Sequence, residues 1–98
     1  MGPPTAIFAS SDLTAMACIR TIRRFGLRVP EDVAVVGFDD LSISAHMEIP
    51  LTTVSQSKAE IAQRAAELLF EQVKGGRQAK PAAGTILIQP TLQIRDSA

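Results

Sequence analysis

Two adjacent carboxylates and a group of hydroxyls are the side chains of this sequence best suited to chemistry. Asp39 and Asp40 follow one apolar run, and Ser10, Ser11 and Asp12 follow another. A carboxylate accepts hydrogen bonds from a polar ligand, and a serine hydroxyl both donates and accepts them. Neighbouring residues of an extended chain point to opposite sides, so the two carboxylates are poorly placed to act as one catalytic pair. The pattern favours binding of a polar small molecule over catalysis.

Each of these residues also has a structural interpretation. Asp39 either accepts hydrogen bonds from a ligand or caps the loop that follows it. Asp12 either caps a helix, which is the stronger interpretation, or contacts a ligand, and Ser11 has the same two alternatives. Ser and Asp are among the side chains that best satisfy the free N–H groups at a helix start. The residues alone leave these alternatives open.

The motifs of familiar catalytic and metal sites are absent from the sequence. It has no glycine-rich phosphate loop, no HExxH and no GxSxG. The single cysteine, Cys18, excludes a disulfide within the chain and a cysteine-based zinc site. His46 has no partner at a metal-ligand spacing. We therefore expect no enzyme activity, no cofactor and no metal.

A strand–helix–strand unit is expected to position the candidate residues. We predict strands over 5–9 and 33–38 and a helix over 13–25. The second strand is apolar without alternation, which is typical of a parallel strand buried on both faces. In such a unit both strands end at one edge of the sheet, where open α/β sheets bind ligands. Ser11 and Asp39 are therefore expected to lie at one edge.

The second half of the sequence contains a long amphipathic helix, with weaker patterns around it. We expect a helical turn over 43–47, an extended connector over 51–54 and the long helix over 58–74. Two strands are expected after it, over 85–88 and 91–95. Gly75 and Gly76 are suited to ending the helix. The final strand alternates, which favours the edge of a sheet, and residues 95–98 are expected to fray.

Composition limits the partners. Ten basic and ten acidic side chains cancel among the 98 residues, which gives no electrostatic case for nucleic acid. No apolar run approaches the roughly 20 residues that span a bilayer, and residues 1–4 lack the features of a secretory signal. One cysteine suits a reducing compartment. We expect no membrane partner and a cytoplasmic location.

Four stretches resemble a known family. They lie, in order, at 8–17, 26–40, 50–54 and 89–95, and the longest reads Gly-Leu-Arg-Val-Pro-Glu-Asp-Val-Ala-Val-Val-Gly-Phe-Asp-Asp. Together they are similar to the LacI/GalR family of bacterial transcription regulators. The resemblance covers nearly the whole chain and corresponds to the last third of such a regulator. It implies an α/β fragment of a periplasmic-binding-protein-like (type I) fold, with a parallel sheet flanked by helices.

The resemblance also implies a domain organisation and a function. Residues 1–98 would be an incomplete effector-binding and dimerisation domain, with 5–50 and 85–95 in the C-terminal subdomain. Residues 51–84 would supply a crossover and a helix of the other subdomain. The implied effector is a sugar or a related metabolite, and DNA would be bound through a helix-turn-helix domain absent from this chain. The alternative is a segment of a periplasmic sugar-binding protein of a transport system.

The family's effector contacts transfer unevenly. The first Asp after the Gly-aromatic pair contacts the effector in the family, and here it is Asp39. The position before the helix-capping Asp is commonly Asn in the family and is Ser11 here. Serine has one hydroxyl where asparagine has an acceptor and two donors, so the sequence departs from the family there. Asp12 completes the expected effector-binding set.

A dimer face is implied as well. The family's dimer face includes the positions that match Met16 and Met47. Helical spacing places Met16 and Arg20 on one outward stripe, away from the face expected to pack on the sheet. The apolar face of the helix over 58–74 would lack its cover in this chain. We therefore expect a homodimer or a higher homo-oligomer.

Overall fold

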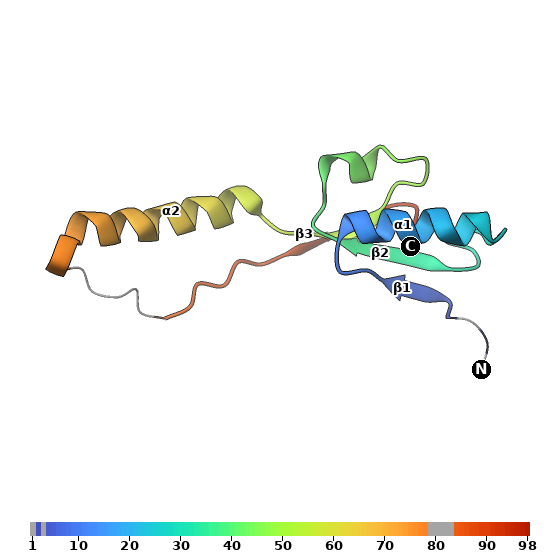
Figure 1. Ribbon diagram of the computed structural model, residues 1–98, viewed down its shortest axis with the longest axis horizontal. Helices are drawn as coiled ribbons and strands as arrows, with labels where there is room; N and C mark the ends of the chain where they lie inside the picture. Colours follow the sequence, from blue (N-terminus) through green and yellow to red (C-terminus); the bar gives the residue numbers. More distant parts are fainter. Residues whose placement is uncertain (1, 3, 79–83) are drawn as a thin grey trace. The chain divides into compact units, whose positions relative to one another are not determined.

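The computed structural model describes residue 2, residues 4–78 and residues 84–98. Its contacts divide the chain into two compact units: unit 1 comprises Met1–Ser55 and Pro90–Ala98, and unit 2 comprises Gln56–Gln89. The elements in chain order are β1 (Ala6–Phe8), α1 (Asp12–Arg24), β2 (Ala34–Phe38), η1 (Ser42–Ala45), β3 (Thr52–Ser55), α2 (Lys58–Gly75), η2 (Gly76–Gln78) and β4 (Thr91–Gln93) (Figure 1). The assignment of 5–50, 51–84 and 85–95 to two subdomains of the resembled fold stays a prediction.

Unit 1 contains a four-stranded sheet in the order β1-β2-β3-β4. β1 and β2 are parallel, which confirms the predicted strand–helix–strand unit. β3 is parallel to β2, and β4 lies antiparallel to β3 at the edge. The prediction of a mere connector over 51–54 is wrong, because Thr52–Ser55 is a third parallel strand inside the sheet. Four residues are too few to show a strand period, although Thr and Val favour strands.

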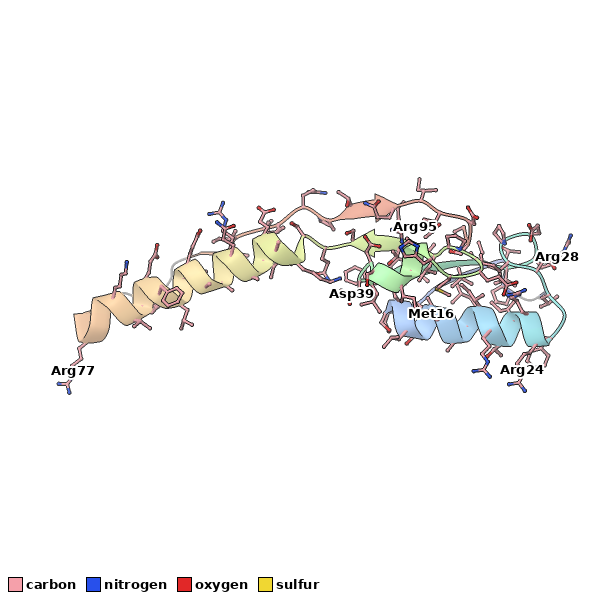
Figure 2. The ribbon with its side chains drawn as sticks, turned by 90° about the horizontal axis from the view of Figure 1, so that it is seen from above. Met16, Arg24, Arg28, Asp39, Arg77 and Arg95 are labelled. Carbon is pink, nitrogen blue, oxygen red and sulfur yellow. The ribbon has the colours of Figure 1, made fainter. Side chains whose placement is uncertain are left out.

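Helix α1 covers one face of this sheet (Figures 1 and 2). The helix begins one residue earlier than predicted and ends at Arg24, and Gly26 follows with φ +77°, a left-handed conformation that glycine adopts without strain. The core residues are all apolar and come from the helix, the sheet and the loops: Ala9, Ala15, Ile19, Val29, Val35 and Leu51. An aliphatic core of this kind agrees with a sequence that has no Trp or Tyr.

Strand β2 is not buried on both faces, contrary to the prediction. Val35 and Gly37 are buried, whereas Ala34, Val36 and Phe38 are only partly buried. The buried pair faces α1, since a Cβ on Gly37 would contact Ala15. An apolar run without alternation is typical of a strand covered twice, and in the described residues of unit 1 only the α1 side has such a cover.

The C-terminal residues are ordered by the sheet, so the prediction of fraying over 95–98 is wrong. Ser97 is 0% exposed. Its hydroxyl donates to the Val35 carbonyl at 2.6 Å and accepts from the Thr52 N–H at 2.8 Å. The Val35 N–H in turn donates to the Ser97 carbonyl at 2.8 Å. Ser97 thus supplies hydrogen bonds to β2 and β3 where their pairing begins, which satisfies backbone groups that would otherwise be buried unpaired.

Unit 2 contains the predicted long helix. α2 ends at Gly75, and Gly76 follows with φ +54°, as expected for a glycine stop. No residue of α2 is buried. The structure assigns no strand to residues 85–88, so that prediction is wrong; a short apolar run becomes a strand only where a neighbouring strand accepts its hydrogen bonds. None of the described helices is long and apolar enough to cross a membrane.

Candidate effector-binding site

The carboxyl ends of β2 and β3 meet the start of α1. The Leu41 N–H donates to Oδ2 of Asp12 at 2.8 Å, which joins the start of the helix to the loop after β2. The Asp39 N–H donates to the Val54 carbonyl at 2.9 Å, which joins the end of β2 to β3. The predicted convergence of the segment at 10–12 with Asp39 and Asp40 is therefore confirmed.

Asp12 is a buried hydrogen-bond acceptor and not the helix cap. Ser11 is the N-cap residue, and its hydroxyl accepts from the Thr14 N–H at 3.2 Å, which corrects the preferred assignment of the cap to Asp12. Asp12 is 0% exposed. Besides the Leu41 N–H, its carboxylate accepts from the Ser44 hydroxyl at 2.6 Å and the Thr53 hydroxyl at 2.5 Å. A buried carboxylate requires such donors, because leaving it unpaired is strongly unfavourable.

Gly37 makes room for this carboxylate. A Cβ added at position 37 would overlap Oδ1 of Asp12 and would lie 3.0 Å from a methyl group of Leu51. Position 37 therefore has no room for a side chain, and glycine is the residue that fits there. This explains in physical terms why glycine interrupts the apolar run of β2 two residues before Asp39.

Asp39 and Asp40 have an unusual backbone. Their φ angles are +130° and +55°, and both lie in the region that non-glycine residues rarely adopt. Such a conformation costs about 1–3 kcal/mol for each residue and persists where surrounding contacts impose it. Here those contacts include the bond from the Asp39 N–H to β3 and a longer one, 3.4 Å, from the Asp40 N–H to the Thr53 hydroxyl. Backbone strain of this kind concentrates at ligand sites.

Arg95 also contributes to this site, and it was not identified from the sequence. Its guanidinium Nη2 donates to Oδ1 of Asp40 at 2.9 Å and its Nη1 donates to the Leu51 carbonyl at 3.0 Å. Its own N–H donates to the Thr52 hydroxyl at 2.8 Å. Figure 2 shows Arg95 over the strands and Asp39 at the end of the sheet. The one signal that could have found Arg95 was its place in the last of the four resembling stretches.

Ser11 and Asp39 are the predicted ligand residues that retain access to solvent, since both are partly exposed. Together they offer a carboxylate acceptor and a hydroxyl that donates or accepts, and this set suits a ligand with several hydroxyl groups. In the part of the chain that the structure describes, no group of three or more His, Cys, Asp or Glu side chains is placed to hold a metal ion.

A second surface gathers the residues predicted for the dimer face. Met16 and Arg20 of α1 and Met47 of the loop after η1 line one hollow, together with Ile49. The hollow combines methionine side chains, which adapt to irregular partners, with the charged side chains of Arg20, Arg23, Arg24 and Glu48. Figure 2 shows Met16 on α1. The structure thus brings together the three predicted residues, although Met47 is far from the other two in sequence.

A bidentate ion pair, between Arg23 and Glu48, is part of the lining of the same hollow. Arg23 donates to both carboxylate oxygens of Glu48, at 2.9 and 3.0 Å. The hydrogen bond and the charge of Arg23 lower the pKa of Glu48 below its ordinary value, and Glu48 raises the pKa of Arg23. Both side chains are exposed to solvent, so the pair contributes little to the stability of the fold.

Comparison with known proteins places the whole chain in one family. The family described as a periplasmic binding protein-like domain matches residues 1–98. The HTH-type transcriptional repressor PurR of Aliivibrio fischeri (strain MJ11) is 45% identical over 71 residues, which are 72% of this chain and 21% of the repressor. The chain thus spans about a fifth of that relative's length, as the 21% shows.

Two solved structures share the fold at substantial identity. A transcriptional regulator CelR–cellobiose complex is 38% identical with a TM-score of 0.86, over 96% of this chain and 28% of that one. The lac repressor dimer bound to operator and the anti-inducer ONPF is 34% identical with a TM-score of 0.84, over 96% of this chain and 32% of that one. These likenesses confirm the predicted α/β fragment of a periplasmic-binding-protein-like fold.

Proposed function

Because this chain belongs to the periplasmic binding protein-like domain family, as part of the core of a LacI/GalR-type transcription regulator, we propose that it supplies the effector-binding and dimerisation segment of a DNA-binding repressor. The effector that we propose is a sugar or a related metabolite with several hydroxyl groups. The proteins compared above are transcription regulators and not enzymes, and they favour this function over that of a segment of a periplasmic sugar-binding transport protein.

The observation that carries the proposal is the conformation of Asp39 at the carboxyl end of β2. Its strained backbone is bonded to β3, and the loop that follows it is bonded to the start of α1 through Leu41 and Asp12. Asp39 and Ser11 are both partly exposed. Maintaining such strain is expected where a side chain must be presented to a ligand. The cellobiose complex of the similar regulator supports a sugar as the effector.

Titration calorimetry on the full-length regulator tests the effector class. We expect at least one of cellobiose, sucrose, lactose and D-ribose to bind, and Asp39→Ala to weaken that binding by about 1–3 kcal/mol, because polar ligand groups lose their acceptor. Asp96→Ala removes an exposed carboxylate from the same unit and serves as the matched control. Unchanged affinity of a folded Asp39→Ala variant would contradict the role of Asp39, and no binding of any of the sugars would contradict the effector class.

The hollow with Met16, Arg20 and Met47 is proposed as part of the dimer face of the regulator. The similar lac repressor structure is a dimer, and a cluster of adaptable apolar side chains among charged ones suits an interface. Met16→Glu in the full-length regulator is expected to shift the dimer toward monomer in analytical ultracentrifugation. A dimer as tight as the wild type would remove this hollow from the interface.

Operator binding is proposed to reside in a part of the regulator outside these 98 residues, and the regulator is proposed to act in the cytoplasm, where the DNA is. The charges of the chain cancel, so it lacks the excess of cations that drives association with phosphates. The full-length regulator should shift its operator in a gel assay, whereas the 98-residue chain should not. A salt-sensitive, sequence-specific shift by the chain alone would overturn the proposal.

A further inference from the structure

We propose that Asp12 is a positioning residue, whose buried carboxylate holds Ser11 and Asp39 at the separation that the effector requires. The inference rests on the proposed function, because it assigns a role within the same site. It replaces the expectation that Asp12 contacts the effector directly. At 0% exposure its carboxylate does not reach the surface on which a ligand binds.

The hydrogen bonds of Asp12 reach every segment that builds the site. Asp12 follows Ser11 directly, so its position determines where the start of α1 lies. Its Oδ2 accepts from the Leu41 N–H, two residues after Asp39, and from the Ser44 hydroxyl in η1. The loop that follows β2 is thus attached at two points to the residue beside Ser11.

Oδ1 of Asp12 provides the attachment to β3. It accepts from the Thr53 hydroxyl, and that hydroxyl also accepts from the Asp40 N–H at 3.4 Å. The next residue, Val54, accepts the Asp39 N–H through its carbonyl. The strained pair Asp39–Asp40 is therefore held between β3 and the start of α1, and one carboxylate joins the two supports.

A carboxylate matches the three donors that surround it. Both oxygens of Asp12 accept hydrogen bonds, one from Thr53 and the other from Leu41 and Ser44. Asparagine has nearly the same shape but carries no charge and presents an NH₂ group in place of one oxygen. That group would either oppose the Leu41 N–H or require the Thr53 hydroxyl to turn away from its present bond to Asp12. Asp12→Asn therefore releases one support of the site without creating a large cavity.

Hydrogen–deuterium exchange on the full-length regulator without ligand is the first test. Asp12→Asn is expected to speed exchange in the segment 39–45 by about tenfold or more, as loss of a charge-assisted hydrogen bond implies, while β1 and the end of α1 keep wild-type rates. Asp32→Asn is the matched control, since Asp32 bonds Arg28 at the surface. Unchanged exchange at 39–45, or faster exchange throughout unit 1, would overturn the proposal.

A double-substitution cycle with cellobiose, sucrose, lactose and D-ribose is the second test, and it separates positioning from general stability. Asp12→Asn alone should lower the affinity for the sugar that binds about tenfold. Combined with Asp39→Ala, it should weaken binding by less than the product of the two single effects, because Asp12 acts through the residue already removed. Effects that simply multiply would overturn the proposal. Absence of sugar binding by the wild type would contradict the proposed function, and the exchange experiment would then decide the role of Asp12.

Discussion

Unit 1 and unit 2 differ in how much of their apolar surface is buried. Unit 1 encloses a core on the α1 side of its sheet, where Ala15, Val35 and Leu51 are each 0% exposed. In unit 2 the long helix α2 has no buried residue, and Leu69 and Val73 are 62% and 66% exposed. An amphipathic helix is stabilised mainly by what its apolar face packs against. Unit 1 therefore contains much of the core that it needs to fold, whereas α2 has an apolar face suited to further partners.

The polar contacts show the same contrast. In unit 1 the Thr53 hydroxyl bonds Asp12 across 41 sequence positions. In unit 2, Glu67 is bonded by Gln63 and Arg64, within one turn of the same helix. Local pairs of this type contribute a few tenths of a kcal/mol. Long-range contacts therefore define unit 1, and local ones support α2.

The largest effect that would test this contrast is self-association of the isolated 98-residue chain. Ile61, Leu69 and Val73 are exposed, and each forgoes roughly 1.5–3 kcal/mol that burial would supply. We expect a dimer or a higher oligomer in light scattering on a chain verified by mass spectrometry, and Leu69→Glu should reduce the association. A stable, cooperatively unfolding monomer of 10.5 kDa would contradict the prediction.

A matched pair of leucine substitutions compares the two units directly. Leu51→Ala removes a side chain that is 0% exposed and should lower the free energy of unfolding by about 2–5 kcal/mol. Leu69→Ala removes one that is 62% exposed in the single chain and should cost only about 0.5 kcal/mol in urea denaturation at low concentration. Similar losses for both would show that α2 is buried after all.

Gly37→Ala tests the close packing of the buried carboxylate in unit 1. The added Cβ would overlap Asp12 and should lower the free energy of unfolding by about 1–3 kcal/mol, the usual cost of overpacking. Gly2→Ala is the control, because no atom lies within 4 Å of the added Cβ there. A Gly37→Ala variant as stable as the wild type would mean that Asp12 can move at little cost.

Asp39→Gly separates strain from ligand contact. At φ +130° glycine is unstrained, so this variant should be more stable than Asp39→Ala by about 1 kcal/mol or more, as thermal unfolding would show. Both variants lose the carboxylate and should bind the effector more weakly. Equal stability of the two would indicate that the backbone at Asp39 relaxes without its side chain.

The smallest effect concerns acid stability at the surface of unit 1. The side chain and the backbone N–H of Arg28 hydrogen-bond Asp32 and lower its pKa below the ordinary value of 3.8. The folded form therefore binds its proton at lower pH than the unfolded form, so this contribution is present above about pH 3.8 and is lost as the pH falls through the folded pKa. Asp32→Asn should make the decline of stability below pH 4 slightly shallower, and added salt should reduce the difference. If the stability of both proteins declined identically below pH 4, the result would contradict a stabilising interaction between Arg28 and Asp32.

The elements that could be predicted from the amino-acid sequence are those whose signals are local. Apolar spacing and glycine stops predicted both long helices. Their C-terminal ends, at Arg24 for α1 and Gly75 for α2, were predicted to within about one residue. The Val-rich run predicted β2, and the rule that parallel strands end at one edge predicted that Asp39 would meet the start of α1. The resembling stretches predicted the family, because motif order and spacing are properties of the sequence alone.

The roles of residues whose partners are distant in sequence became visible only in the folded structure. Asp12 could not be distinguished from a cap until Thr53 was seen to reach it across 41 positions, and Ser97 reaches Val35 across 62. β3 became a strand because β2 and β4 supply its hydrogen bonds. Burial on one face of β2 likewise depended on what lies above it. Such contacts leave no period in the sequence, because each is formed once, between segments that only folding brings together.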